Sequence, residues 1–130
     1  MKTQTILLGI AGFISSLFVF SHLLFYRMFD WETTLNCLSN TNRAIFLTYH
    51  AICILTLLFM GIISVFQTKV LLGSPLKYSV LGFFSFFYLI RIVAEFSLFG
   101  ISSSSLTIVI MCTVPMIFYA IPLFLKPIMK

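Results

Sequence analysis

Four stretches of this chain are each long and apolar enough to cross a lipid bilayer as a helix. They cover roughly residues 5–26, 43–66, 76–97 and 105–125, and a helix needs about 20 apolar residues to span the hydrocarbon core. Only 8% of the 130 residues are charged, whereas soluble domains average about 25%. The sequence therefore predicts an all-α fold, an integral membrane four-helix bundle formed by a single domain of residues 1–130.

The basic residues predict how this bundle is oriented. An even number of spans places both termini on one side, and five lysines belong to that side: Lys2, Lys69, Lys77, Lys126 and Lys130. The opposite side carries Arg27 and Arg43 together with two acidic residues. Because lysine and arginine favour the cytoplasmic side, we expect cytoplasmic termini in a plasma (inner) membrane. The basic residues are scattered singly at the ends of apolar runs, so the net charge of +5 does not indicate nucleic-acid binding.

Polar residues between the spans predict where the helices begin and end. Ser74 followed by Pro75 is expected to open the third span, as an N-cap and a first helical residue. Gly100 is expected to end that span as a C-terminal cap. The serine run 102–105 is expected to cap the start of the fourth span, and residues 39–42 the start of the second.

The first outer loop is predicted to contain a short interfacial helix. Trp31, Leu35 and Leu38 fall at positions i, i+4 and i+7, and Asp30 precedes them as a possible cap. Apolar residues at this spacing form one face that can lie in the membrane interface, and tryptophan is a common anchor there. An irregular loop with a single aromatic anchor is the alternative.

Arg91 and Glu95 stand one helical turn apart inside the third span. Charged residues at membrane depth are costly, so they point to a functional site. With the predicted topology, residues from three spans share the outer half of the bilayer with this pair. The predicted ligand-binding set is Arg91, Glu95, His22, His50, Tyr26 and Tyr88.

A structural role explains the same residues without any ligand. Glu95 can neutralise Arg91 within one helix, and either histidine can donate a hydrogen bond to a neighbouring helix. Two sharper hypotheses use the histidines as ligands. His22 and His50 on adjacent helices can be axial ligands of a haem, or they can hold a transition metal together with a glutamate.

Transport and catalysis are further alternatives. A buried glutamate near histidines suits a small proton-coupled transporter, although the first span has no carboxylate. Arginines that hold a lipid headgroup beside a histidine base suit catalysis on lipid. Three unpaired cysteines, without a CxxC motif, do not indicate thiol redox chemistry.

The function predicted from these residues is binding rather than catalysis. We expect a small multi-pass membrane protein, a non-enzymatic binding or accessory subunit with a polar pocket in the outer half of the bilayer. Arg91 would hold an anionic group, Glu95 would orient Arg91, and the histidines would supply hydrogen bonds. A chain this small is also expected to form a homo-oligomer or to join a larger membrane complex.

Overall fold

The computed structural model describes residues 2–125, which fold almost entirely into helices. Four of these helices are long and apolar enough to cross a membrane: α1 (Lys2–Met28), α3 (Asn40–Phe66), α5 (Lys77–Phe99) and α6 (Ser103–Phe124). Short helices α2 (Trp31–Thr34), η1 (Leu35–Cys37) and α4 (Thr68–Leu72) connect them. The prediction of an all-α chain with four long apolar helices, and a short helix between the first two, is confirmed.

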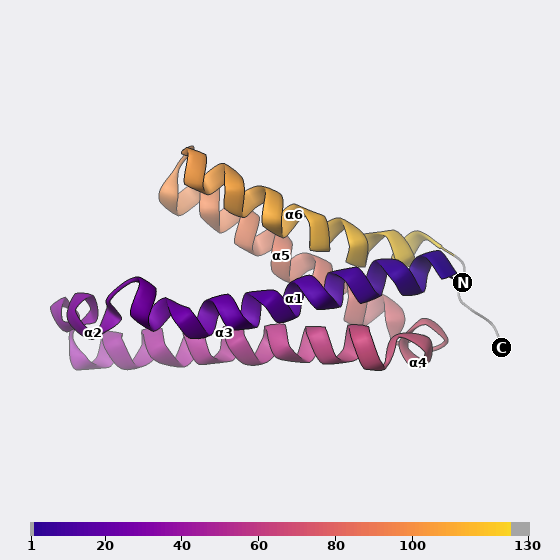
Figure 1. Cartoon of the computed structure of the whole chain (residues 1–130), viewed down its shortest axis with the longest axis horizontal. Coiled ribbons are helices and arrows are strands. Elements are labelled where there is room, and N and C mark those ends of the chain that lie inside the picture. Colours follow the sequence, from indigo (N-terminus) through magenta and orange to yellow (C-terminus); the bar gives the residue numbers. More distant parts are fainter. Residues whose placement is uncertain (1, 126–130) are drawn as a thin grey trace.

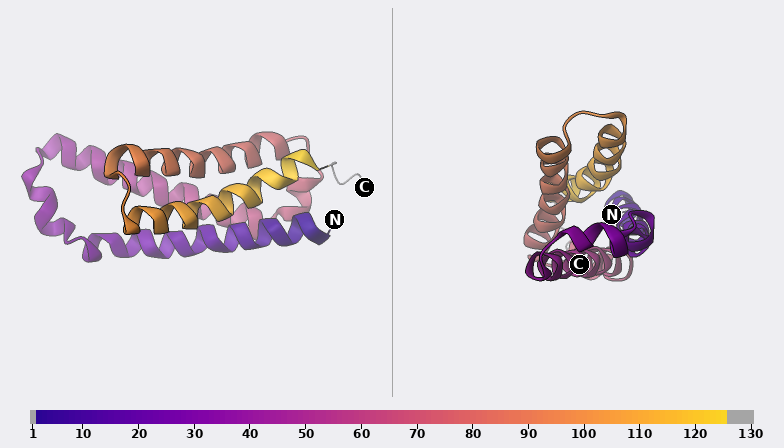
Figure 2. Two further views of the ribbon diagram at one scale, coloured as in Figure 1. Left: turned by 90° about the horizontal axis from the view of Figure 1, so that it is seen from above. Right: turned by 90° about the vertical axis from the view of Figure 1, so that its left-hand side faces the viewer.

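The long helices form two antiparallel pairs, α1 with α3 and α5 with α6 (Figures 1 and 2). The start of α1, the end of α6 and α4 lie at one end of the molecule, which we call the terminal end, and α2 lies at the opposite end, which we call the α2 end (Figure 1). The pairs lie close together at the terminal end and diverge toward the α2 end (Figure 1). Helix α1 packs against both α3 and α6, so it joins the two pairs.

The basic residues at the helix ends differ between the two ends of the bundle. Lys2, Lys69 and Lys77 belong to the terminal end, whereas Arg27 and Arg43 belong to the α2 end (Figure 1). Lys126 and Lys130 were assigned to the same side as Lys2 and lie outside the described residues. Nζ of Lys77 donates a hydrogen bond of 2.9 Å to the carbonyl of Leu125, which ties the start of α5 to the end of α6.

The predicted caps are found at the second and fourth spans. Oγ of Ser39 accepts from the backbone N–H of Asn42 at the start of α3. Oγ of Ser102 accepts from the N–H of Ser105 at the start of α6. Gly100 ends α5 with a φ of 70°, a left-handed value that favours glycine because other residues have a Cβ atom.

Two predicted caps are wrong in detail. Helix α5 begins at Lys77 rather than at Pro75, because Ser74 and Pro75 form a turn in which Oγ of Ser74 accepts from the N–H of Leu76. Asp30 does precede α2, but its side chain makes no capping hydrogen bond. Its backbone has a φ of 46°, and its carbonyl accepts from the N–H groups of Thr33 and Thr34.

The short helix after α1 is smaller than the predicted amphipathic helix. The α-helical part, α2, ends at Thr34, and the 3₁₀ turn η1 follows it directly. Leu35 is buried, but Leu38 lies beyond both elements and is exposed. Trp31 packs edge-on against Phe46 and His50, with ring centroids 4.8 and 4.7 Å apart, so the α2 segment is held to α3 by aromatic contacts.

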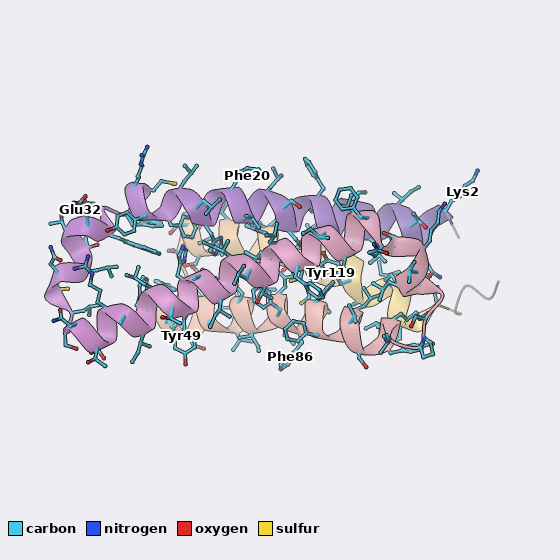
Figure 3. The ribbon with its side chains drawn as sticks, turned by 90° about the horizontal axis from the view of Figure 1, so that it is seen from below. Lys2, Phe20, Glu32, Tyr49, Phe86 and Tyr119 are labelled. Carbon is cyan, nitrogen blue, oxygen red and sulfur yellow. The ribbon has the colours of Figure 1, made fainter. Side chains whose placement is uncertain are left out.

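The outer faces of the long helices are apolar, as expected for helices that contact lipid. Phe20, Tyr49 and Phe86 point away from the bundle (Figure 3), and 66%, 68% and 57% of their surfaces are exposed. Tyr119, by contrast, is fully buried. Because a bilayer would cover such faces, the structure indicates that the four apolar helices are embedded in lipid.

Helices α1 and α3 approach closely where Gly12 faces Gly61. A Cβ atom added to Gly12 would lie 2.6 Å from Cβ of Ser64 and 3.2 Å from the carbonyl oxygen of Gly61. Contacts between small residues of this kind let membrane helices pack tightly without a hydrophobic driving force. This contact places the fully buried Ser64, near the end of α3, beside α1.

Candidate functional site

A cluster of four buried hydroxyl groups joins all four long helices. It contains Ser15 of α1, Ser64 of α3, Tyr88 of α5 and Tyr119 of α6, each at most 2% exposed. Oγ of Ser15 lies 2.8 Å from the hydroxyl of Tyr88 and 3.0 Å from that of Tyr119. Oγ of Ser64 donates to the hydroxyl of Tyr119 at 3.1 Å. We refer to these four residues as the hydroxyl cluster.

The donor and acceptor roles within the hydroxyl cluster follow from the hydrogen bonds that its two serines donate. Ser15 donates to the carbonyl of Ala11 at 3.0 Å, so its oxygen is left to accept from both tyrosines. Tyr119 in turn accepts from Ser64. Each of the four hydroxyl protons therefore has an acceptor. Because unsatisfied polar groups in an apolar interior cost free energy, this complete arrangement favours the observed packing of the helices.

A cavity of about 360 Å³ opens beside this cluster, between the two helix pairs. Along α1 its wall runs from Phe18 to Met28, a distance of about 15 Å at 1.5 Å per residue, and Phe29 follows directly after the helix. The other walls come from α3, α5 and α6, and Tyr88 belongs both to this wall and to the hydroxyl cluster. The cavity therefore lies between the diverging halves of the helix pairs, toward the α2 end.

The wall of this cavity is mostly aromatic and aliphatic. Its polar side chains are few: Arg91, His22, Ser21 and Tyr88, together with the cysteines Cys53 and Cys112. With histidine neutral, Arg91 is the only charged residue among the described residues that line it. An apolar pocket with a small number of polar groups is typical of small-molecule sites, whose volumes are roughly 300–1,000 Å³.

Arg91 and Glu95 form the ion pair that their spacing predicts. Nη1 of Arg91 lies 2.6 Å from Oε2 of Glu95. The two side chains differ in burial, since 39% of the Arg91 side chain is exposed and only 4% of Glu95. Oε2 accepts no hydrogen bond of good geometry from the described residues, so the ion pair is what balances its charge. Glu95 thus lies behind Arg91, which faces the cavity.

The two histidines lie together at the α2 end of the bundle. Their rings are nearly parallel, with centroids 5.6 Å apart and an angle of 20° between the planes. Nδ1 of His22 lies 2.9 Å from the carbonyl oxygen of Phe18, and Nε2 of His50 lies 3.1 Å from the carbonyl oxygen of His22. Because a carbonyl can only accept, both of these ring nitrogens carry a proton. His50 therefore links α3 to α1.

The structure separates the six predicted site residues into two groups. Arg91, His22 and Tyr88 line the cavity. The other three do not: Glu95 is buried behind Arg91, His50 is packed between His22 and Trp31, and Tyr26 is 39% exposed and contacts Trp31. Tyr26 lies about one turn beyond His22 on α1, and its ring contacts Trp31 instead of lining the cavity.

The histidine arrangement does not fit a haem. Two axial ligands must point a ring nitrogen at the same iron from opposite sides of the macrocycle, whereas these rings lie face to face. A metal site of the predicted kind also lacks its third ligand. Within residues 2–125, no group of three histidine, cysteine, aspartate or glutamate side chains is placed to hold a metal ion.

The chain matches no protein-family model, no curated protein and no solved structure. The site is therefore interpreted from its own geometry. Sequence analysis missed the hydroxyl cluster and the aromatic wall of the cavity. One signal for the cluster is present in the sequence. Ser15 follows Gly12 by three residues and Ser64 follows Gly61 by three residues, so each serine lies on the same helix face as a small residue.

Proposed function

We propose that this protein binds a single-chain amphiphile in the cavity between the two helix pairs, and that the anionic head of this ligand contacts Arg91. The observation that carries the proposal is the composition of the wall, in which one guanidinium stands in a mostly apolar surface. A ligand with one charged group and one apolar chain matches that surface. The volume of about 360 Å³ is near the lower end for ligand sites, which favours one chain over two.

The proposal places the α2 end of the bundle outside the cell. Lys2, Lys69 and Lys77 flank the terminal end, and this bias favours the cytoplasm for both termini. The cavity then lies in the outer half of the bilayer, where a ligand can enter from the outer leaflet between α1 and the α5–α6 pair. In this account the protein has a binding role, and Arg91 and His22 contact the ligand head without taking part in a reaction.

Substitution of Arg91 by glutamine is expected to weaken binding of an anionic amphiphile at least tenfold. Hydrogen bonds to charged groups contribute roughly 1.5–3 kcal/mol, and about 1.4 kcal/mol corresponds to a factor of ten in affinity. The measurement is fluorescence titration of the purified protein, in nanodiscs of phosphatidylcholine, with a fluorescent long-chain alkyl sulfonate. This head stays ionised near neutral pH.

Arg27→Gln is the matched control. Arg27 is an exposed arginine at the same end of the bundle and does not line the cavity, so its loss should leave the affinity unchanged. Equal weakening by both substitutions would show that the probe responds only to general surface charge. Unchanged affinity in Arg91→Gln would also contradict the proposal.

A further inference from the structure

We infer that an anionic amphiphile binds at Arg91 together with one proton, which is taken up by Glu95. This inference rests on the proposed function, because it concerns the same cavity and the same arginine. It assigns Glu95 the role of a proton acceptor whose charge depends on whether the cavity is occupied. The inference is based on the charge balance of the ion pair and on the unequal burial of its members.

Arg91 and Glu95 together are electrically neutral. Arg91 contributes one positive charge and Glu95 one negative charge, and Nη1 lies 2.6 Å from Oε2. With neutral histidine, no other residue that the structure describes in the cavity wall is charged. An anion that entered this site without a proton would leave one unbalanced negative charge in an apolar environment, which is strongly unfavourable.

Arg91 has room for a second partner. A guanidinium has five N–H donors, and the ion pair with Glu95 is made through Nη1 of Arg91. The side chain remains 39% exposed and lines the cavity. A ligand head can therefore bind the exposed part of the guanidinium, where it competes with Glu95 for the same positive charge.

Glu95 is the group that this competition affects most. It is 3% exposed, and Arg91 is the only ionic partner of Oε2 within the described residues. When a ligand anion shares the charge of Arg91, the buried carboxylate loses most of its stabilisation, and protonation removes its charge. The balance is one anion plus one proton bound, with Glu95 converted from carboxylate to carboxylic acid and the total charge of the site unchanged.

The other titratable groups in the cavity wall come from all four long helices: His22 on α1, Cys53 on α3, Tyr88 on α5 and Cys112 on α6. His22 and the two cysteines interact electrostatically with Arg91, and the phenol of Tyr88 is neutral near neutral pH. Cys112 also interacts with Glu95. A thiol is already neutral near neutral pH, so it cannot compensate an added anion by taking up a proton. His22 is the one alternative acceptor, and the experiment separates it from Glu95.

The test is isothermal titration calorimetry of the protein in phosphatidylcholine nanodiscs with a long-chain alkyl sulfonate. Measurements in two buffers of different ionisation enthalpy give the number of protons taken up per ligand. We expect one proton for the unsubstituted protein and none for Glu95→Gln, which already has an uncharged side chain. At pH values at which Glu95 is ionised before the sulfonate binds, the affinity for the sulfonate should fall about tenfold for each unit by which the pH increases. The reason is that one proton is taken up with each anion. In Glu95→Gln the affinity should stay nearly constant.

The outcomes distinguish this inference from the proposed function. Binding that depends on Arg91 but takes up no proton would overturn the proton coupling and leave the proposed function standing. Proton uptake that persists in Glu95→Gln and disappears in His22→Asn would assign the proton to His22 and overturn the inference. A failure of the unsubstituted protein to bind the sulfonate saturably would overturn both. Saturable binding by Glu95→Gln also shows that this variant has folded.

Discussion

Substitution of Gly12 by alanine is expected to destabilise the bundle by about 2 kcal/mol. The added Cβ atom would lie 2.6 Å from Cβ of Ser64, which is closer than two non-bonded carbon atoms can approach. Helices α1 and α3 must therefore move apart, and overpacking of this kind typically costs about 1–3 kcal/mol. Because Ser64 also donates to Tyr119, the same movement should weaken the hydroxyl cluster.

Gly9→Ala is the matched control for this substitution. Gly9 lies in the same helix, and a Cβ atom added there would meet nothing within 4 Å. Alanine is also the better helix former, so Gly9→Ala should be neutral or slightly stabilising. The free energy of unfolding can be measured by titration with sodium dodecyl sulfate in mixed micelles, with helicity followed by circular dichroism. Equal stability of the two variants would contradict the close α1–α3 contact.

Loss of the Ser15 hydroxyl is expected to cost about 2 kcal/mol. Ser15→Ala removes the acceptor of both Tyr88 and Tyr119, and each buried donor without a partner costs roughly 1–3 kcal/mol. For two donors these costs would sum to about 2–6 kcal/mol. Because interhelical hydrogen bonds in membranes contribute only about 0.6 kcal/mol on average, we expect a value at the lower end of that range. The reason for the larger effect here is that a single serine serves two tyrosines.

Ser16→Ala provides the comparison for Ser15→Ala. Ser16 packs against Gly61 of α3, but its Oγ donates to the carbonyl of Gly12 in its own helix, so its removal breaks no hydrogen bond between helices. We expect its unfolding free energy to fall by about 1 kcal/mol or less, because no buried donor loses its partner. If both alanine variants had equal stability in the same titration, the hydroxyl cluster would not contribute to packing.

The helices were predictable from the sequence, because each depends on local features of the chain. Four long apolar stretches give four helices, and Gly100 and Ser102 stand where a helix end needs a left-handed residue or a side-chain acceptor. The i, i+4 spacing of Arg91 and Glu95 was likewise sufficient to predict their contact. These features act within one helix or between neighbours in the chain.

The relative arrangement of the helices was not predictable in the same way. In a membrane protein both the lipid-facing and the core-facing sides are apolar, so hydropathy does not distinguish them. For this reason Tyr119 of the hydroxyl cluster was not recognised as part of a site, and Tyr26 was assigned to the pocket although it is exposed. The divergence of the two helix pairs, which leaves the cavity, depends on contacts between residues that are distant in sequence.

The most direct test of amphiphile binding is to fill the cavity and to map where a ligand attaches. Met111 lines the cavity, whereas its neighbour Ile110 does not and is 64% exposed. Tryptophan at position 111 should occupy the space of the ligand, whereas tryptophan at position 110 should extend into lipid. The measurement uses a photoreactive long-chain carboxylate in phosphatidylcholine nanodiscs, with attachment sites identified by mass spectrometry of the peptides.

We expect the unsubstituted protein to be labelled mainly at residues that line the cavity, which include Phe18, His22, Phe25, Ile108 and Cys112. This labelling should be lost in Met111→Trp and retained in Ile110→Trp. Labelling spread over outward-facing residues such as Phe20 and Phe86, and unchanged in Met111→Trp, would show that the amphiphile contacts the protein only as bulk lipid. That result would contradict the binding function proposed for this cavity.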